Sequence, residues 1–418
     1  MISFITNYLA SPMVVLGVVA LIGLIILKKP VGEIISGVLK TMMGYTVLSA
    51  GTGIIGDPIT LLTGLVQTIM KTDGAVLPLY WAVTGESMKL WGTEASLMFV
   101  IGFVLNMILA RVTKFKYLAL TVHLQLFWTG FMACIMATAG FNSTSIIIIG
   151  GIITGIYYWV ATGISAHYIR DYTDEHANFT PSVVGVIVAG ESARLFQKNK
   201  IDTENINYPE WMEFLKDSTL ACVVSVLLMN IVFAIIAGPS VVAEYAGTTP
   251  VPLYIVTMAI TFGGGIAVIL YGVRMMLSEL IPAFSGIAEK FLPNVILGLD
   301  YPTAYPYAGT SVMFGFVFSL LGSIVGTIVM ALVGVSPVVV PGVQINFFEG
   351  ALIGVYANAR GGLKNVIFSS FICGFALQFL VAFTFPLTGQ LMATNGAYEA
   401  IDFNTIGLLL AKLFNLFK

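Results

Sequence analysis

The sequence predicts an all-α polytopic membrane protein whose helices cross a bilayer about ten times. Of its 418 residues, 58% are hydrophobic and only 10% are charged, whereas about a quarter of the residues in a soluble domain carry charge. Many apolar residues gather in runs long enough to cross about 30 Å of hydrocarbon. Because lipid offers the backbone no hydrogen-bond partners, and the alternating pattern of barrel strands is absent, these runs are predicted to be helices.

Ten apolar runs follow one another along the chain. They lie at residues 12–27, 31–55, 97–110, 118–140, 144–166, 218–238, 252–277, 307–335, 337–357 and 365–386. No basic cluster precedes the first run and no small-residue cleavage site follows it before Lys28, so we expect a retained span rather than a signal peptide. Residues 403–418 are too few for a full span and are predicted to form a surface or short terminal helix.

Basic residues predict the orientation and the internal organisation of this single membrane domain, residues 1–418. The clusters that begin at Lys28, Arg111, Arg170 and Arg360 all fall inside if the N-terminus lies outside. Five runs precede the hydrophilic segment and five follow it, so the two halves have opposite topology. We therefore expect two inverted repeats. The predicted parts are a first repeat at 1–169, a cytoplasmic or hairpin segment at 170–217, a second repeat at 218–390 and a C-terminal tail at 391–418.

Composition and motifs argue against several other classes of protein. A formal net charge of −2 and scattered lysines and arginines give no basic surface for nucleic acid. Cys134, Cys222 and Cys373 each lie alone inside an apolar run, which predicts packing cysteines rather than disulfides or a zinc site. The sequence has no phosphate-binding loop, nucleophile elbow or HExxH motif. We expect no catalytic residue, metal or cofactor.

Three segments combine apolar residues with glycine or proline but are too short or too broken to span a membrane. They are residues 73–96, 181–190 and 292–309. Re-entrant hairpins have this composition, because broken helices expose backbone groups and helix ends to a solute. Loops at the membrane surface would be the alternative interpretation. The sequence therefore favours a transport protein whose binding site lies at these breaks.

Polar side chains within apolar segments are candidates for solute binding, because they are costly to place in a membrane. Asp300 closes an apolar run just before Tyr301, and it either binds hydroxyl groups or caps the next helix. His123 and Gln125 both donate and accept hydrogen bonds, although a bond between helices would also explain them. Weaker candidates in the first two broken segments are Glu86, Ser87, His176, Asn178, Thr180, Ser182 and Glu191. The pairs Arg274 with Glu279 and Asn346 with Glu349 are expected to be contacts on helix faces.

Several ordered motifs resemble those of a known family. The sequence resembles the ascorbate-type enzyme IIC permeases of the bacterial phosphotransferase system, the ascorbate/galactitol superfamily, from about residue 12 to about residue 386. The motifs that carry the resemblance are Gly272-Val273-Arg274-Met275-Met276, Ser278-Glu279-Leu280, Ala283-Phe284-Ser285-Gly286-Ile287, Leu299-Asp300, the stretch from Pro341-Gly342 to Gly361-Gly362, Ala50-Gly51-Thr52-Gly53-Ile54 and Leu120-Thr121-Val122-His123.

The resemblance implies a sugar permease of the bacterial cytoplasmic membrane. Such a permease is a homodimer, in which a scaffold carries a mobile core that moves the sugar like an elevator. It serves a phosphoenolpyruvate-dependent system in which a separate enzyme IIB, phosphorylated on cysteine and supplied by enzyme IIA, phosphorylates the sugar during uptake. Arg194, Lys198 and Lys200 either attract that phosphorylated partner or anchor the chain on the inner side.

The resemblance also assigns two binding residues and narrows the substrate. His123 matches the family's binding histidine and Asp300 its hairpin aspartate. Phe127 stands where ascorbate carriers have a glutamine, and residues 179–182 lack their hairpin histidine and glutamines. The expected substrate is therefore an ascorbate-like sugar, sugar acid or polyol rather than ascorbate itself.

Two other functions stay open on the residues alone. One is an ion-coupled secondary sugar or organic-acid transporter with an elevator mechanism, in which Asp300 would bind a proton or a cation. The other is a sensor that transports nothing, which would leave the broken segments unexplained.

Overall fold

A computed structural model describes residues 12–70, 76, 78, 80–173, 178–180, 182–197, 200–206, 209–211, 214, 217–292 and 294–416. These residues are mostly helical, and the chain is a polytopic helical membrane protein. Helical segments long and apolar enough to cross a membrane are Val83–Val112, Ser143–Ile169, Val251–Met276, Gly309–Val333 and Leu363–Thr394. The pair Cys222–Ala237 and Pro239–Ala246, bent by 117°, makes one more if it counts as one span. The count of ten spans stays a prediction.

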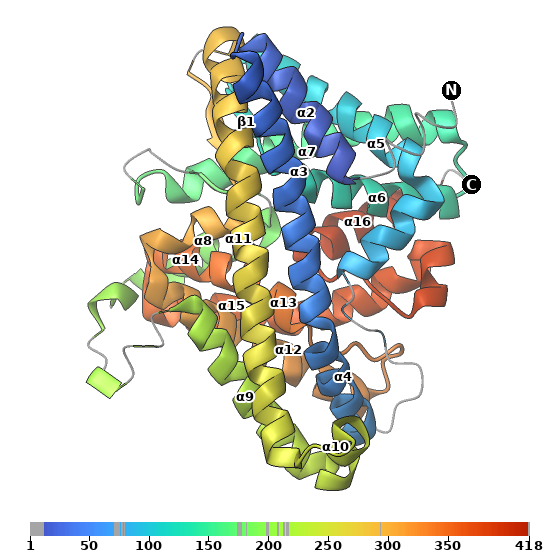
Figure 1. Cartoon of the computed structure of the whole chain (residues 1–418), viewed down its shortest axis with the longest axis vertical. Coiled ribbons are helices and arrows are strands. Elements are labelled where there is room, and N and C mark those ends of the chain that lie inside the picture. The colour runs from blue at the N-terminus through green and yellow to red at the C-terminus, as the bar shows by residue number, and fades with distance from the viewer. Residues whose placement is uncertain are drawn as a thin grey trace.

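One group of helices is built around a long antiparallel pair. α3 (Val31–Ile54) runs beside α11 (Val251–Phe291), down the front of Figure 1. A side chain at Gly51 would lie 2.7 Å from the backbone nitrogen of Ile269, so glycine permits this close approach. Around the pair pack α2 (Pro12–Ile26), α4 (Gly56–Met70), α9 (Ser218–Ala237) and α10 (Pro239–Ala246). We call these six helices the first group.

The remaining α-helices, long and short, form a second group that packs densely within itself. Its strongest contacts join α12 to α15 and α5 to α6 and α7. Between the two groups the described helices touch mainly where α9 meets α12 and α2 meets α6. The second group contains α5 (Tyr80–Val112), α6 (Val122–Thr138), α7 (Ser143–Ile169), α8 (Val183–Ser192), α12 (Gly309–Val333), α13 (Val343–Ile345), α14 (Ala351–Gly361), α15 (Leu363–Thr384) and α16 (Ile401–Asn415).

Two short strands join distant parts of the second group. β1 (Tyr117–Ala119) pairs in parallel with β2 (Ile296–Gly298), and the next residue, Leu299, bridges to Phe179. β1 leads directly into α6, and β2 leads into the turns η5 (Tyr301–Thr303) and η6 (Tyr305–Tyr307). This pairing brings the start of α6 beside the turn that begins after β2.

The predicted broken segments are irregular in the structure, each in its own way. Within 73–96, α5 begins at Tyr80 and is kinked at Trp91, whose φ and ψ are −135° and 28°. Within 181–190 lies α8, a helix of only 10 residues. Within 292–309 lie β2 and the turns η5 and η6. A π-helical turn, η7 (Asn346–Gly350), follows α13, and a long turn, η8 (Phe385–Thr394), follows α15.

The position of α16 differs from the prediction for the C-terminal end of the chain. A short terminal helix is present, but its first residues, Ile401, Asp402 and Phe403, are buried. The prediction of a surface helix is therefore wrong for this end of α16. The cause is tertiary packing, because the preceding residues enter the interior and carry the helix start with them.

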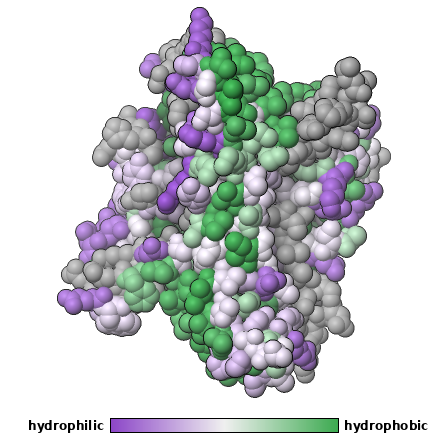
Figure 2. All heavy atoms as spheres, in the orientation of Figure 1, coloured by the Kyte–Doolittle hydropathy of each residue, from purple (hydrophilic) through white to green (hydrophobic). Residues whose placement is uncertain are grey.

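The outer surface carries apolar side chains at helical spacing. On α5, Val100, Val104 and Ile108 are exposed, and they lie one turn apart on one face. Figure 2 shows apolar residues in a band down the front face, over the first group of helices. Such a face, exposed on a chain with membrane-spanning helices, is the surface that contacts lipid tails.

The segment between α8 and α9 is tied to the second group. The backbone nitrogen of Leu363 donates to the carbonyl of Ile201 (2.8 Å). Glu204, in η3 (Thr203–Asn205), accepts from the backbone nitrogen of Ser311 (3.1 Å) at the start of α12. Residues 200–205 are therefore fastened to α12 and to the junction of α14 and α15.

Candidate functional site

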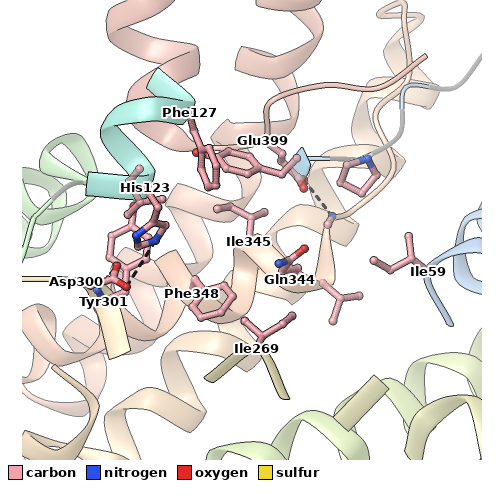
Figure 3. Close-up of a pocket in the computed structure, with 15 residues that line it drawn as sticks. Ile59, His123, Phe127, Ile269, Asp300, Tyr301, Gln344, Ile345, Phe348 and Glu399 are labelled. Atoms are coloured by element: carbon pink, nitrogen blue, oxygen red, sulfur yellow. Dashed lines mark hydrogen bonds and ion pairs between the residues drawn. The ribbon is translucent and has the colours of Figure 1, made fainter. Parts of the chain in front are cut away.

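A cavity lies between the two groups of helices (Figure 3). Ile59 on α4 and Ile269 on α11 belong to the first group. The other lining residues lie in the second group, between its helices, or in the two segments that lead from the first group into α5 and α12. The lining residues are Ile59, Pro78, Tyr80, His123, Leu124, Phe127, Ile269, Asp300, Tyr301, Gly342, Val343, Gln344, Ile345, Phe348 and Glu399.

His123 and Asp300 face one another on this lining. His123 is the second residue of α6 and Asp300 follows β2, so the β1–β2 pairing brings them together. Nε2 of His123 lies 3.6 Å from Oδ2 of Asp300, and both side chains are buried. This separation is too long for a direct hydrogen bond, but a hydroxyl oxygen can reach both atoms at once.

Each member of the pair has one further feature that bears on binding. Oδ1 of Asp300 accepts from the backbone nitrogen of Tyr301 (2.9 Å), the first residue of the turn η5, which leaves Oδ2 to face His123. Nδ1 of His123 is buried and has no hydrogen-bond partner among the described residues. An unpartnered buried polar atom costs free energy, so a ligand that reaches Nδ1 would stabilise it.

Aromatic rings cover the cavity beside this pair. The ring of Phe127 packs edge to face against His123, with 5.7 Å between centroids, and against Tyr80 at 5.4 Å. Phe348 lines the same space. Such rings offer apolar faces to the C–H groups of a sugar while the polar pair addresses its hydroxyl groups.

Tyr301 joins the His123–Asp300 pair, but Gln125, Thr180 and Ser182 do not line the cavity. The amide nitrogen of Gln125 donates to the carbonyl of Ala119 (3.1 Å), which ties α6 to β1. The hydroxyl of Thr180 donates to Thr162 (3.3 Å). Ser182 precedes α8 with a left-handed φ of 77°. Gln125 and Thr180 therefore hold neighbouring segments together outside the cavity lining.

The other predicted candidates lie farther from the cavity lining. Glu86 pairs with Lys89 (2.8 Å) in a solvent-exposed contact. Ser87 shares a buried hydrogen bond with the hydroxyl of Tyr398 (2.6 Å). Glu191 accepts from Tyr168 (2.7 Å) and pairs with Arg194 (2.6 Å). Asn178 donates to the carbonyl of Thr162 (3.1 Å), and His176 and Lys198 lie outside the described residues.

Sequence reasoning missed buried carboxyl groups around the C-terminal segment. Oε2 of Glu349 accepts from the backbone nitrogen of Ile401 (2.9 Å), and its Oε1 lies 3.4 Å from the hydroxyl of Tyr301. The expected pair of Glu349 with Asn346 is wrong, because Asn346 instead bonds to Ser319 and Ser323 of α12. The π-helical turn changes which side chains face one another.

Asp402 and Glu399 complete this set. The carboxylate of Asp402 accepts from the backbone nitrogens of Val183 (2.7 Å) and Val184 (2.8 Å) at the start of α8, and from the hydroxyl of Tyr157 (2.5 Å). Oε1 of Glu399 accepts from the backbone nitrogen of Gly342 (3.0 Å). The sequence signal for both was weak, two carboxyl groups in the apolar stretch 396–403 of the predicted tail.

The ionisable side chains on the lining, apart from tyrosine, are two carboxyl groups and one imidazole. Asp300 and His123 lie together, and Glu399 lies across the cavity (Figure 3). None of the described lining residues is Lys or Arg. Among the described residues no group of three His, Cys, Asp or Glu side chains is placed to hold a metal ion. The arrangement suits a ligand that presents several hydroxyl groups.

Comparisons with known proteins place the chain beside permeases. The family model EIIC-GAT, a PTS system sugar-specific permease component, matches residues 7–401. A curated relative, the ascorbate-specific PTS system EIIC component of Mycoplasma pneumoniae, is 24% identical over 463 aligned positions. That alignment covers 95% of this chain and 67% of the relative.

Proposed function

Because the chain belongs to the EIIC-GAT family of sugar-specific permease components of the phosphotransferase system (PTS), we propose that the cavity between its two helix groups binds the transported sugar. The family makes this chain a sugar permease and a multi-pass protein of the cell membrane. The proposal adds the place where the sugar binds and the residues that hold it.

The observation that carries the proposal is the buried His123–Asp300 pair on the cavity lining. Polar groups are costly inside a membrane protein unless a partner satisfies them. Oδ2 of Asp300 and both nitrogens of His123 have capacity for hydroxyl groups, and Nδ1 has no partner among the described residues. Tyr301 and the ring of Phe127 bound the same space. A sugar, sugar acid or polyol fits this combination of hydroxyl partners and aromatic walls.

The phosphoryl donor is proposed to be a separate enzyme IIB, charged by enzyme IIA. The three cysteines of this chain are buried in the structure, where a phosphorylated partner cannot exchange with them. Arg194 is exposed beside α8, and its guanidinium is suited to attract a phosphorylated protein. Uptake would then be driven by conversion of the sugar to its phosphate on the inner side of the membrane.

An elevator movement within a homodimer is the proposed mechanism. Its support is the division of the helices into two groups that pack densely within themselves and sparsely against one another. The cavity lies at their boundary, with Ile59 and Ile269 on one side and the polar residues on the other. Sliding the second group along the first would carry the sugar with it. Ten spans in two inverted repeats belong to the same proposal.

The test uses vesicles that contain the permease, the general PTS proteins and the cognate enzyme IIB. Each vesicle preparation receives a panel of labelled sugars, sugar acids and polyols, and both free and phosphorylated product are measured. We expect phosphorylated product only when phosphoenolpyruvate and enzyme IIB are present. Accumulation of free solute on an ion gradient, without enzyme IIB, would instead establish an ion-coupled transporter.

The same vesicles test the site. His123→Ala and Asp300→Asn should each lower sugar binding by about 10- to 100-fold, because each removes a hydrogen bond to a charged or buried group. His167→Ala and Asp171→Asn are matched controls, since both residues are exposed at the end of α7 and neither lines the cavity. Wild-type affinity in either cavity variant would remove that residue from the site.

A further inference from the structure

We infer that Glu399 is a substrate-binding residue and that it selects an uncharged, hydroxyl-terminated sugar or polyol over a sugar acid. The inference rests on the proposed function, because it concerns the same cavity. Neither the motifs of the sequence nor the resemblance to known permeases pointed to Glu399. It belongs to the short segment between η8 and α16, which the sequence placed in a tail.

The segment that carries Glu399 is held firmly in the interior. Tyr398 on one side is hydrogen-bonded to Ser87 of α5 (2.6 Å), and Ile401 on the other donates its backbone N–H to Glu349 (2.9 Å). The side chain of Glu399 itself is only 1% exposed. Its carboxyl group therefore has a fixed position before any ligand arrives.

The two oxygens of this carboxyl group have different surroundings. Oε1 accepts from the backbone nitrogen of Gly342 (3.0 Å) and from the amide of Gln378 (3.2 Å). Oε2 is buried and has no hydrogen-bond partner among the described residues. A Cβ atom at Gly342 would lie 1.5 Å from Oε2, so glycine is required for the carboxyl group to lie there. The hydrogen bond to Gly342 gives Oε1 a structural role. It gives no role to Oε2, which keeps its capacity for a ligand.

Glu399 lies across the cavity from the first polar pair. Figure 3 shows Glu399 on one side, His123 and Asp300 on the other, and Phe127 and Ile345 between them. A chain of hydroxyl groups can therefore meet a polar partner at each end and apolar side chains in the middle. This is the pattern of an elongated polyhydroxylated ligand.

The chemistry of Oε2 decides which terminal group the site accepts. A terminal hydroxyl donates its proton to a carboxyl oxygen and forms a strong hydrogen bond. Burial raises the pKa of Glu399 to about 8, so its carboxyl group is ionised only above that pH. The carboxylate of a sugar acid then has no proton to donate and meets a second negative charge, with no Lys or Arg among the described lining residues to offset the repulsion. The site therefore discriminates between a primary alcohol and a carboxylate at the same carbon.

The experiment compares a hexitol with the aldonic acid of the same configuration, which differ only in that terminal group. Binding to the purified full-length permease is measured for both above pH 8, where Glu399 is ionised because its pKa is about 8. The wild-type protein should bind the hexitol at least about tenfold more tightly than the acid. Glu399→Gln keeps an acceptor for Gly342 and Gln378 but replaces the unpartnered oxygen with an NH₂ group, which donates to a carboxylate. The preference should then shift toward the acid by about tenfold or more.

Glu349→Gln is the matched control, because Glu349 is a buried carboxyl group that does not line the cavity, and because glutamine keeps an acceptor oxygen for the backbone N–H of Ile401. It should leave the hexitol-to-acid ratio unchanged. An unchanged ratio in Glu399→Gln, with D300N still lowering the affinity for the sugar, would overturn the inference and leave the proposed function intact. If Glu399→Gln does not fold, the wild-type pair decides, and equal or tighter binding of the acid overturns the inference. Absence of binding by any member of the sugar panel would overturn both.

Discussion

Asp402 satisfies the first turn of α8 from a distant part of the chain. Its carboxylate accepts from the backbone nitrogens of Val183 and Val184, two of the donors that a helix start leaves without partners. Because the site is buried, water cannot replace the carboxylate. The side chain thus fixes α8 against α16 and against Tyr157 of α7.

Asp402→Ala should therefore destabilise the protein by about 1–3 kcal/mol, the cost of leaving buried donors without an acceptor. Thermal unfolding in detergent measures the loss. Asp217→Ala is the control, since Asp217 caps α9 in the same way (2.8 and 3.1 Å) but at an exposed position, where water takes over the bonds. Equal losses in the two variants would contradict the role given to burial.

Single residues were predictable where the polar side chain interrupts an apolar run. His123, Asp300 and Tyr301 stand out in this way and do meet on the cavity lining. Gln125 stands out in the same way and Thr180 less so, yet both bond to residues outside the cavity lining, because the sequence does not say which face of a segment points inward. Glu399 was missed because it lies outside all the apolar runs, in the segment that was predicted to be a C-terminal tail.

At the scale of elements, α12 and α15 pack backbone to backbone through glycines. A Cβ atom at Gly374 would lie 1.9 Å from the carbonyl oxygen of Ser319, and one at Gly322 would lie 2.0 Å from that of Phe371. Backbone atoms cannot turn aside as a flexible side chain can. Close approach of this kind is how helices associate in a membrane.

Gly374→Ala should separate these two helices and lower the yield of folded, monodisperse protein severalfold, because overpacking costs about 1–3 kcal/mol. Size-exclusion chromatography and the unfolding temperature check this. Gly264→Ala in α11 is the control, because a Cβ atom there meets nothing within 4 Å. Comparable behaviour of the two variants would show that the contact tolerates a methyl group.

Helix positions were predicted well where hydropathy alone decides them. The run at 365–386 became α15 at Leu363–Thr384, and the run at 31–55 became α3 at Val31–Ile54. α4 was missed because its apolar residues are diluted by polar ones. α11 continues to Phe291, beyond the end predicted at residue 277, although Pro282 and Gly286 lie in this part and disfavour a helix. Neither hydropathy nor helix propensity could have predicted that length.

At the scale of the whole molecule, the cavity belongs to a boundary between two bodies. The first group draws α2, α3 and α4 from one half of the chain and α9, α10 and α11 from the other. No local pattern predicts such a grouping, because it depends on contacts between residues far apart in sequence. The odd number of apolar runs on each side of the hydrophilic segment suggested two related halves of opposite topology. It could not say which helices would pack together.

Ile269→Cys reports on movement at this boundary. Ile269 is fully buried on the cavity lining, so a cysteine there should react with a membrane-permeant maleimide only when the two groups shift. A bound sugar should slow the labelling severalfold. The three native cysteines are buried and should contribute little background.

Ile260→Cys is the control for that experiment, since it lies on the same helix with 59% of its side chain exposed. Its labelling should be indifferent to the sugar. If the sugar also left the labelling of Ile269→Cys unchanged, the sugar would not protect position 269 from the maleimide. That result would contradict sugar binding in this cavity.

The fastening of residues 200–205 has a mechanical consequence. Ile201 and Glu204 are bonded to the ends of α12 and α15, the same body that carries Asp300 and His123. A force applied to that short segment is therefore transmitted to α12 and α15. A protein that binds residues 200–205 would therefore hold the second group of helices rather than the first. Its binding and release would act on the group that lines most of the cavity.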